Sequence, residues 1–139
     1  MLVNRKESEA RFSEVDSMGI VWHGHYIRYF EDGREAFGKE HSLGYMHVYE
    51  QGFFIPIVNV NCNYKRPIRY NEPLMIETRY VDTPAAKIIF NYTLYNKHSK
   101  EIYATGSSEQ VFLTRERELH LTVPDFFVQW KKDRGIVTS

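Results

Sequence analysis

The stretch FSEVDSMGIVWHGHYIRYFEDGREAF, residues 12–37, changes character halfway along. Its first half holds a lone carboxylate, Asp16, in a turn-like segment that ends at Gly19. In its second half, apolar residues recur three, four and seven positions apart: Tyr26, Ile27, Phe30, Ala36 and Phe37. This spacing is typical of one face of an α-helix. The stretch therefore predicts a turn carrying Asp16, followed by a helix from about Trp22 that ends at Gly44.

One glycine, Gly33, lies inside the predicted helix, where it costs about 1 kcal/mol relative to alanine. A close approach of the helix backbone to a sheet explains such a residue. A second, short helical segment is expected before Gly52.

Beyond Gly52 the spacing of the apolar residues changes to alternation, which is typical of strands. Strands are predicted at residues 58–64, 74–80, 88–94 and 102–113, and an edge strand at 2–12. In the first of these, Val58, Val60, Cys62 and Tyr64 are expected to form a half-buried face. The last contains Gly106, Ser107 and Ser108, which allow a helix or a ligand to pack closely. A C-terminal helix follows, with Pro124 in its first turn, an apolar stripe of Phe126, Phe127 and Trp130, and Lys131, Lys132 and Arg134 before Gly135.

The predicted order is a strand, a long helix, four antiparallel strands and a short helix. This order indicates an α+β fold in a single domain, residues 1–139. One helix cannot cover both faces of a five-stranded sheet, so a second copy of the chain is expected to cover the other face or an edge. A homodimer or homotetramer is therefore predicted.

The composition excludes several classes of protein. Eighteen Lys and Arg residues balance eighteen Asp and Glu residues, which argues against a general nucleic-acid binder. The chain has one cysteine, Cys62, and cannot form an internal disulfide, so a cytoplasmic location is expected. No segment approaches the roughly 20 apolar residues of a membrane span.

The element order and the opening stretch together resemble the hot-dog fold, in which a five-stranded antiparallel sheet wraps a long central helix. More narrowly, the chain resembles the 4-hydroxybenzoyl-CoA thioesterase family, including the Tol-Pal-associated acyl-CoA thioesterases. The resemblance rests on Asp16-x-x-Gly19-Ile20-Val21-Trp22-His23-x-x-Tyr26, Tyr29-Phe30-Glu31, Arg34-Glu35-Ala36-Phe37, Tyr64-Lys65-Arg66-Pro67-Ile68-Arg69-Tyr70 and Glu72-Pro73-Leu74. The chain departs from the family in two places. Glu14-Val15-Asp16 replaces an Asp-x-Asp, and His25 stands where a small polar residue is common.

The resemblance implies hydrolysis of an acyl-CoA thioester without a cofactor. Asp16 would act as the nucleophile or general base, and the backbone N–H near His23 would polarise the thioester carbonyl. Both roles suit the chemistry, because a carboxylate can attack or activate water and a helix N-terminus stabilises an oxyanion. The resemblance also implies that the site lies at a dimer interface.

Substrate-binding roles are predicted for Gly19, Trp22, His25, Tyr26, Lys65 and Arg66. Each has a simpler alternative. Asp16 could only open an Asx turn, and Trp22 and Tyr26 fit ordinary core more readily than an acyl-pocket wall. Gly19 is expected at positive φ, and either histidine could be a packed, hydrogen-bonded residue. Lys65 and Arg66, with Arg69, Arg115 and Arg117, could bind the phosphates of coenzyme A or simply be solvated. A metal site is not expected, because no third and fourth ligand accompany His23 and His25.

Two further functions remain open at this stage. An acyl-acyl carrier protein thioesterase would use the same chemistry on a different carrier. A non-catalytic acyl-CoA-binding domain is the third candidate. Such a domain would gain nothing from the negative charge of Asp16 beside the phosphates of its ligand.

Overall fold

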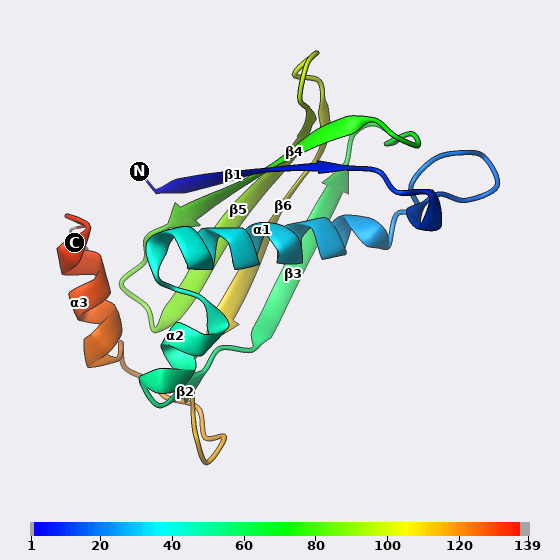
Figure 1. Ribbon diagram of the computed structural model, residues 1–139. Coiled ribbons are helices and arrows are strands. Elements are labelled where there is room, and N and C mark those ends of the chain that lie inside the picture. Colours follow the sequence, from blue (N-terminus) through cyan, green and yellow to red (C-terminus); the bar gives the residue numbers. More distant parts are fainter. Residues whose placement is uncertain (1, 137–139) are drawn as a thin grey trace.

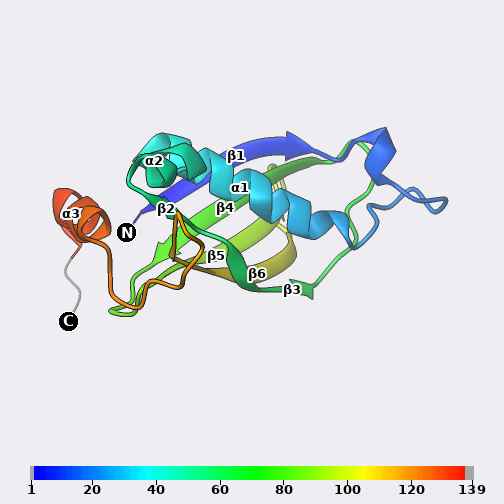
Figure 2. The same cartoon turned by 90° about the horizontal axis from the view of Figure 1, so that it is seen from below.

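The computed structural model describes residues 2–136, which form one curved antiparallel sheet with a long helix along one face (Figures 1 and 2). The main sheet contains, in spatial order, β1 (Val3–Glu9), β4 (Pro73–Val81), β5 (Lys87–Asn96), β6 (Ile102–Val111) and β3 (Ile57–Tyr64). The helices are α1 (His25–His41), α2 (Tyr45–Glu50) and α3 (Asp125–Asp133), with a 3-10 turn at Phe12–Glu14. A small second sheet pairs β2 (Phe53–Phe54) with β7 (Leu113–Thr114). The predicted α+β order is confirmed.

The core lies between α1 and the concave face of the sheet. Alternate residues of β4 and β5 point toward the helix and are buried, namely Leu74, Ile76, Thr78 and Tyr80, and Ile88, Phe90, Tyr92 and Leu94. From α1, Phe30 stacks on the Tyr92 ring, with 4.5 Å between the ring centroids. The period-2 pattern of these strands therefore identified the correct buried face.

Two glycines allow α1 to approach the sheet closely. A Cβ atom added at Gly33 would lie 2.3 Å from Oγ1 of Thr78, and one at Gly106 would lie 2.5 Å from the Phe30 ring. No heavy atom fits at these distances, so both positions require glycine. The approach predicted for Gly33 is confirmed, and in β6 it is Gly106 that accommodates the helix, through Phe30.

The ends of the helices differ from the prediction. Helix α1 begins at His25 rather than near Trp22, because residues 20–22 are held in β-bridges and other backbone pairings. It ends at His41 and not at Gly44, and its C-cap, Ser42, adopts the left-handed conformation with φ 57°. Gly44 instead precedes α2 and packs against Gly38, where a Cβ would lie 2.6 Å from the Gly44 Cα atom. The predicted strand at 102–113 breaks at Phe112, which separates β6 from β7.

The prediction of a half-buried β3 is wrong for the single chain. Val58, Val60 and Tyr64 are all exposed, because β3 lies at the edge of the sheet and α1 packs mainly on β1 and β4. The far face of the sheet, by contrast, is polar and carries ion pairs such as Arg5–Glu77 at 3.1 Å. That face needs no apolar cover. The uncovered apolar surface lies along β3.

Helix α3 packs on the end of the sheet near the C-terminus of α1 (Figure 1). Its predicted apolar stripe is confirmed, with Phe127 and Trp130 buried. Pro124 precedes the helix as its N-cap rather than lying in its first turn. Lys131 is also buried, where its ammonium lies 2.8 Å from the Asp82 carboxylate. Within residues 2–136 no helix is both long enough and apolar enough to cross a membrane.

Candidate functional site

The carboxylate of Asp16 lies on a tight turn at one end of α1. The Asp16 N–H donates to the Ile20 carbonyl at 2.9 Å, and the Gly19 N–H donates to the Asp16 carbonyl at 3.0 Å. Oδ1 of Asp16 accepts the Met18 N–H at 2.8 Å, which is an Asx turn. Gly19 has φ +76°, as predicted. The side chain is exposed, and its second oxygen accepts no hydrogen bond from residues 2–136. One oxygen therefore holds the turn and the other is open.

The turn is attached to the segment that links β3 to β4. The Val21 N–H donates to the Ile68 carbonyl at 2.7 Å, and the Tyr70 N–H donates to the Gly19 carbonyl at 3.1 Å. These bonds lie on both sides of the bridge between Ile20 and Arg69. Backbone pairing thus fixes the position of the Asp16 turn relative to the sheet.

The start of α1 lies beside the turn and presents free backbone donors. The N–H groups of His25 and Tyr26 bond to the carbonyls of Trp22 and His23. The N–H groups of His23 and Gly24 donate to no other described residue. Unpaired donors at a helix N-terminus carry partial positive charge. The structure therefore places two such donors at the same end of α1 as Asp16 (Figure 1).

Gly24 allows the indole of Trp22 to cross the helix start. A Cβ atom there would lie 2.1 Å from an indole carbon. In the sequence, Gly24 is visible only as a glycine between two histidines. The reason that a glycine is required there is the position of the Trp22 indole, which only the structure shows.

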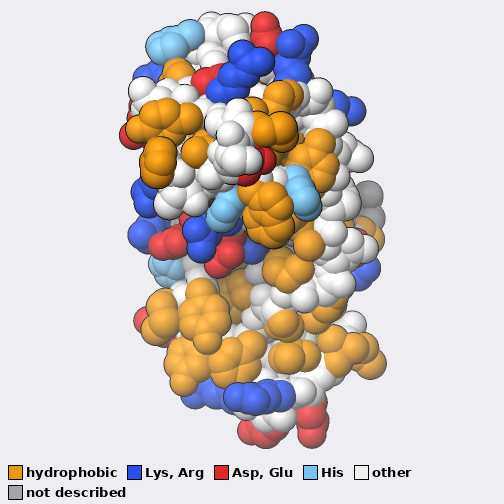
Figure 3. Space-filling view, turned by 90° about the vertical axis from the view of Figure 1, so that its right-hand side faces the viewer, with side chains coloured by type: hydrophobic (Ala, Val, Ile, Leu, Met, Phe, Trp, Pro, Cys, Tyr) orange, Lys and Arg blue, Asp and Glu red, His pale blue; other side chains and the backbone are white. Residues whose placement is uncertain are grey.

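Aromatic and imidazole rings surround this helix start, and they gather on one end of the molecule (Figure 3). The Trp22 ring lies 4.9 Å from that of His23 and 5.6 Å from that of His25. Tyr64, at the end of β3, donates its hydroxyl proton to the His23 carbonyl at 2.9 Å. Trp22 is 53% exposed, so the expectation of a core position is wrong for it. Tyr26 is buried, as expected.

The Tyr26 hydroxyl supports the loop after β3. It accepts the Ile68 N–H at 3.2 Å and lies 3.3 Å from the Arg66 carbonyl, to which it donates. Burial raises the pKa of the Tyr26 phenol, so it stays protonated and keeps both bonds.

A buried carboxylate, Glu14, supports the turn through hydrogen bonds to the segments on both sides of it. Its side chain is 7% exposed, and Oε1 accepts both the Tyr29 hydroxyl proton and the Arg11 N–H, each at 2.8 Å. Its carbonyl accepts the Trp22 N–H at 3.0 Å. Burial, followed by the bond to Glu14, raises the pKa of Tyr29, which remains a donor. Glu14 thus connects α1 to the residues on both sides of Asp16.

The Tyr29→Phe variant should be less stable by about 1–3 kcal/mol, because it leaves a buried carboxylate without one of its two donors. Urea denaturation followed by far-UV circular dichroism measures this loss. Tyr95→Phe is the matched control, since the Tyr95 hydroxyl makes no hydrogen bond within residues 2–136. Equal stability of the two variants would contradict a supporting role for the Glu14–Tyr29 bond.

The five basic residues proposed for phosphate binding fall into two groups. Lys65, Arg66 and Arg69 lie on the segment between β3 and β4, and Arg69 of this segment pairs with Ile20 in the Asp16 turn. Arg66 is already paired with Glu101 at 3.0 Å. Arg115 lies near α2, where its guanidinium donates to the Tyr49 carbonyl at 3.0 Å, and Arg117 follows β7. Only the first group therefore lies on the segment that pairs with the Asp16 turn, and within it Arg69 makes the contact.

Within the described chain, no three His, Cys, Asp or Glu side chains are placed to hold a metal ion. The rings of His23 and His25 both contact the Trp22 indole, and His23 is exposed while His25 is half-buried.

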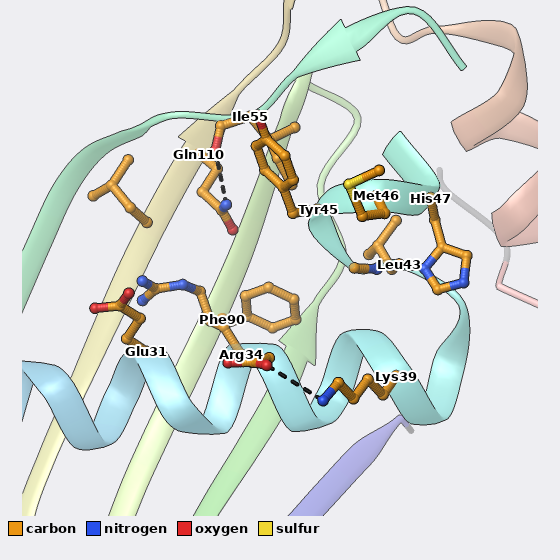
Figure 4. A pocket seen from close by; sticks show the side chains of 13 residues that line it. Glu31, Arg34, Lys39, Leu43, Tyr45, Met46, His47, Ile55, Phe90 and Gln110 are labelled. Atoms are coloured by element: carbon orange, nitrogen blue, oxygen red, sulfur yellow. Dashed lines mark hydrogen bonds and ion pairs between the residues drawn. The ribbon is translucent and has the colours of Figure 1, made fainter. Parts of the chain in front are cut away.

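A cavity of about 640 Å³ opens between α1, α2 and the start of β3 (Figure 4). Its apolar walls are formed by Leu43, Tyr45, Met46, Ile55, Ile57 and Phe90. Arg34 and Gln110 are the polar groups deep in it, while Glu31, Glu35, Lys39 and His47 also line it. Arg34 and Glu35 belong to a motif of the resemblance, but the sequence did not predict a cavity beside them. The cavity forms only because α1, α2 and the sheet pack together.

A family model described as the thioesterase-like superfamily matches residues 10–131. The Bacillus subtilis (strain 168) protein named "Putative acyl-CoA thioesterase YneP" is 30% identical, over 95% of this chain and 98% of its own. A DHNA-CoA thioesterase from Staphylococcus aureus superposes with a TM-score of 0.80 at 26% identity, covering 99% of this chain and 98% of its own. Slr0204, a 1,4-dihydroxy-2-naphthoyl-CoA thioesterase from Synechocystis, gives a TM-score of 0.83 at 14% identity, covering 97% and 99%. The architecture is thus a hot-dog fold.

Proposed function

The chain belongs to the thioesterase-like superfamily, and on that premise we propose that it hydrolyses an acyl-CoA thioester to a free acid and coenzyme A. Within the superfamily, the motif around Asp16 favours the 4-hydroxybenzoyl-CoA thioesterase family and its Tol-Pal-associated branch. A cytoplasmic location is part of the proposal and rests on the single cysteine.

In the proposed reaction, Asp16 brings about attack on the thioester carbonyl carbon by one of two routes. Its free oxygen either attacks to form an anhydride, which water then opens, or removes a proton from the attacking water. Either route puts negative charge on the carbonyl oxygen. The free N–H groups of His23 and Gly24 are the donors suited to that oxygen. The sulfur leaves as the thiolate of coenzyme A and is protonated.

The observation that carries this proposal is the pairing of a half-free carboxylate with unpaired helix N-terminal donors. The test is release of free thiol from a panel of short, medium, long and aromatic acyl-CoAs. A protein that bound these compounds and released no thiol from any of them would be an acyl-CoA-binding domain, and the proposal would fail.

The acyl carrier protein is the second candidate carrier, because Lys65 and Arg69 are exposed on the segment that pairs with the turn, and neither forms an ion pair with a described carboxylate. Carrier proteins are acidic, and such a partner would be steered by these cations. Comparing one acyl group on coenzyme A and on a carrier protein separates the two candidates. Preference for the carrier should fall with added salt.

We further propose that two copies of the chain associate along β3. This strand also carries Tyr64, which bonds to the His23 carbonyl at the start of α1 in its own chain. The strand is an unpaired edge with exposed apolar residues, and such an edge favours pairing with another strand. A closed two-fold dimer is the simplest assembly, and a tetramer would add a second interface.

Val60→Lys should convert the dimer to a monomer, because it places two charges in the shared strand edge. Val60 is 38% exposed in the single chain, so the charge is tolerated in the monomer. Light scattering after size-exclusion chromatography gives the mass. Val128→Lys, at a residue that is 37% exposed on α3, is the matched control. A monomeric wild-type protein, or a dimer unaffected by Val60→Lys, would refute this interface.

A further inference from the structure

The cavity between α1 and α2 contains a cation that the protein itself leaves largely unused. The Arg34 side chain extends from α1 into the cavity and is half-buried (Figure 4). A guanidinium has five N–H donors. Within residues 2–136 only one hydrogen bond is made, from Nη1 to the Tyr92 hydroxyl at 3.1 Å, and no carboxylate lies within ion-pair distance.

The single bond of Arg34 orients the guanidinium. The Tyr92 hydroxyl accepts from Arg34 and lies 2.5 Å from the Ser108 hydroxyl, with which it also bonds. Burial raises the pKa of Tyr92, so this phenol stays neutral and remains in the chain of bonds. The Arg34 side chain is therefore held from the sheet side, and the remaining N–H groups are left for another partner.

Gln110 presents an additional polar atom to the same space. Its Nε2 donates to the Ile55 carbonyl at 2.9 Å, which fixes the orientation of the amide. The amide oxygen points into the cavity (Figure 4). This oxygen can accept a proton from a ligand hydroxyl, while Arg34 can only donate.

The charges at the mouth of the cavity largely cancel. Lys39 and Glu35 pair with each other at 3.3 Å on the surface of α1. Glu31 lines the cavity without forming an ion pair with Arg34. The half-buried guanidinium of Arg34 keeps donors that no described side chain accepts from, and this favours a ligand that supplies an acceptor.

We propose that this cavity binds the far end of the acyl group, and that Arg34 selects acyl groups ending in a carboxylate over those ending in a methyl group. A carboxylate accepts two parallel N–H bonds from a guanidinium, and the apolar walls contact the carbon chain before it. This inference rests on the proposed thioesterase function and specifies its substrate class.

The distance along α1 fits this assignment. Gly24 and Glu31 are seven residues apart and so lie on nearly the same side of the helix, and Arg34 is within one turn of Glu31. The rise of an α-helix puts Arg34 about 15 Å from Gly24 along the axis. A thioester carbonyl at Gly24 would therefore extend its acyl chain along α1 toward the cavity.

The experiment compares acyl-CoAs of equal length ending in a carboxylate or a methyl group. In wild type the carboxylate series should have the higher kcat/KM, and Arg34→Gln should lower it by about 10- to 100-fold while changing the methyl series little. Arg79→Gln, on the polar far face of the sheet, makes the same chemical change and should alter neither series. Thermal melting establishes whether each variant is folded. If Arg34→Gln does not fold, Arg34→Lys takes its place in the same comparison.

Each outcome decides between the proposals. A wild-type preference for the methyl series, or equal losses in both series for the Arg34 variants, would overturn the role of Arg34 and leave the thioesterase function intact. If no thioester is hydrolysed, the proposed function fails instead. Calorimetric binding of the carboxylate-ended acyl-CoA would then test the cavity directly. Binding that depends on Arg34 would support the inference, and binding that does not would refute it.

Discussion

The Asp16→Asn variant should lose at least about 100-fold in kcat/KM for acyl-CoA hydrolysis while remaining as stable as the wild type. Asparagine cannot act as a nucleophile or base. Its amide oxygen can still accept the Met18 N–H, as Oδ1 does at 2.8 Å, so the turn should persist. The substitution thus removes the chemistry and keeps the geometry. Free-thiol release under subsaturating substrate measures the effect.

The matched control for this experiment is Asp125→Asn at the exposed start of α3. It makes the same change in charge far from the turn and should leave turnover unchanged. Asp16→Asn with wild-type turnover would show that this carboxylate only forms an Asx turn. A large drop in melting temperature would mean that the lost activity reports on the turn and not on the chemistry.

The Phe30→Ala variant should be less stable by about 3–5 kcal/mol, the range expected for truncating a fully buried phenylalanine. Phe30 is fully buried between α1 and the sheet, stacked on Tyr92 and in contact with the backbone at Gly106. The surrounding strands are hydrogen-bonded on both sides and cannot collapse into the space left by the ring. Guanidinium denaturation at equilibrium measures the loss.

Ile102→Ala at the exposed start of β6 is the comparison, since this residue is 44% exposed whereas Phe30 is fully buried. Its cost should lie within about 0.5 kcal/mol. A Phe30→Ala loss of similar size would mean that the helix can shift toward the sheet, contrary to the close packing at Gly33 and Gly106.

Much of the fold was predictable from local pattern. The order of the elements, the inward faces of β4 and β5 and the close approach at Gly33 all follow from spacing, because each depends on residues near one another in the chain. The boundaries were less predictable. Residues 20–22 have an apolar pattern that could continue a helix, but pairing with residues 68–70 holds them in extended structure.

The candidate site divides in the same way. The turn at Asp16 and Gly19 was predictable because its hydrogen bonds are local. The contacts of Glu14 with Tyr29 and of Tyr64 with His23 join residues 15 and 41 positions apart, and no local pattern reports them. The basic residues were grouped by type, but only their positions in the fold separate those near the turn from those near α2.

The sequence by itself determined the fold class, the turn that carries Asp16 and the helix that starts beside it, because periodicity and turn chemistry act over a few residues. Only the tertiary structure decided that β3 is an exposed edge, that Trp22 is at the surface, and that Arg34 lies in a cavity where no carboxylate of residues 2–136 is within ion-pair distance. Exposure and pairing depend on which distant segments meet, and in this chain the two edge strands, β1 and β3, pair with strands that are remote in sequence.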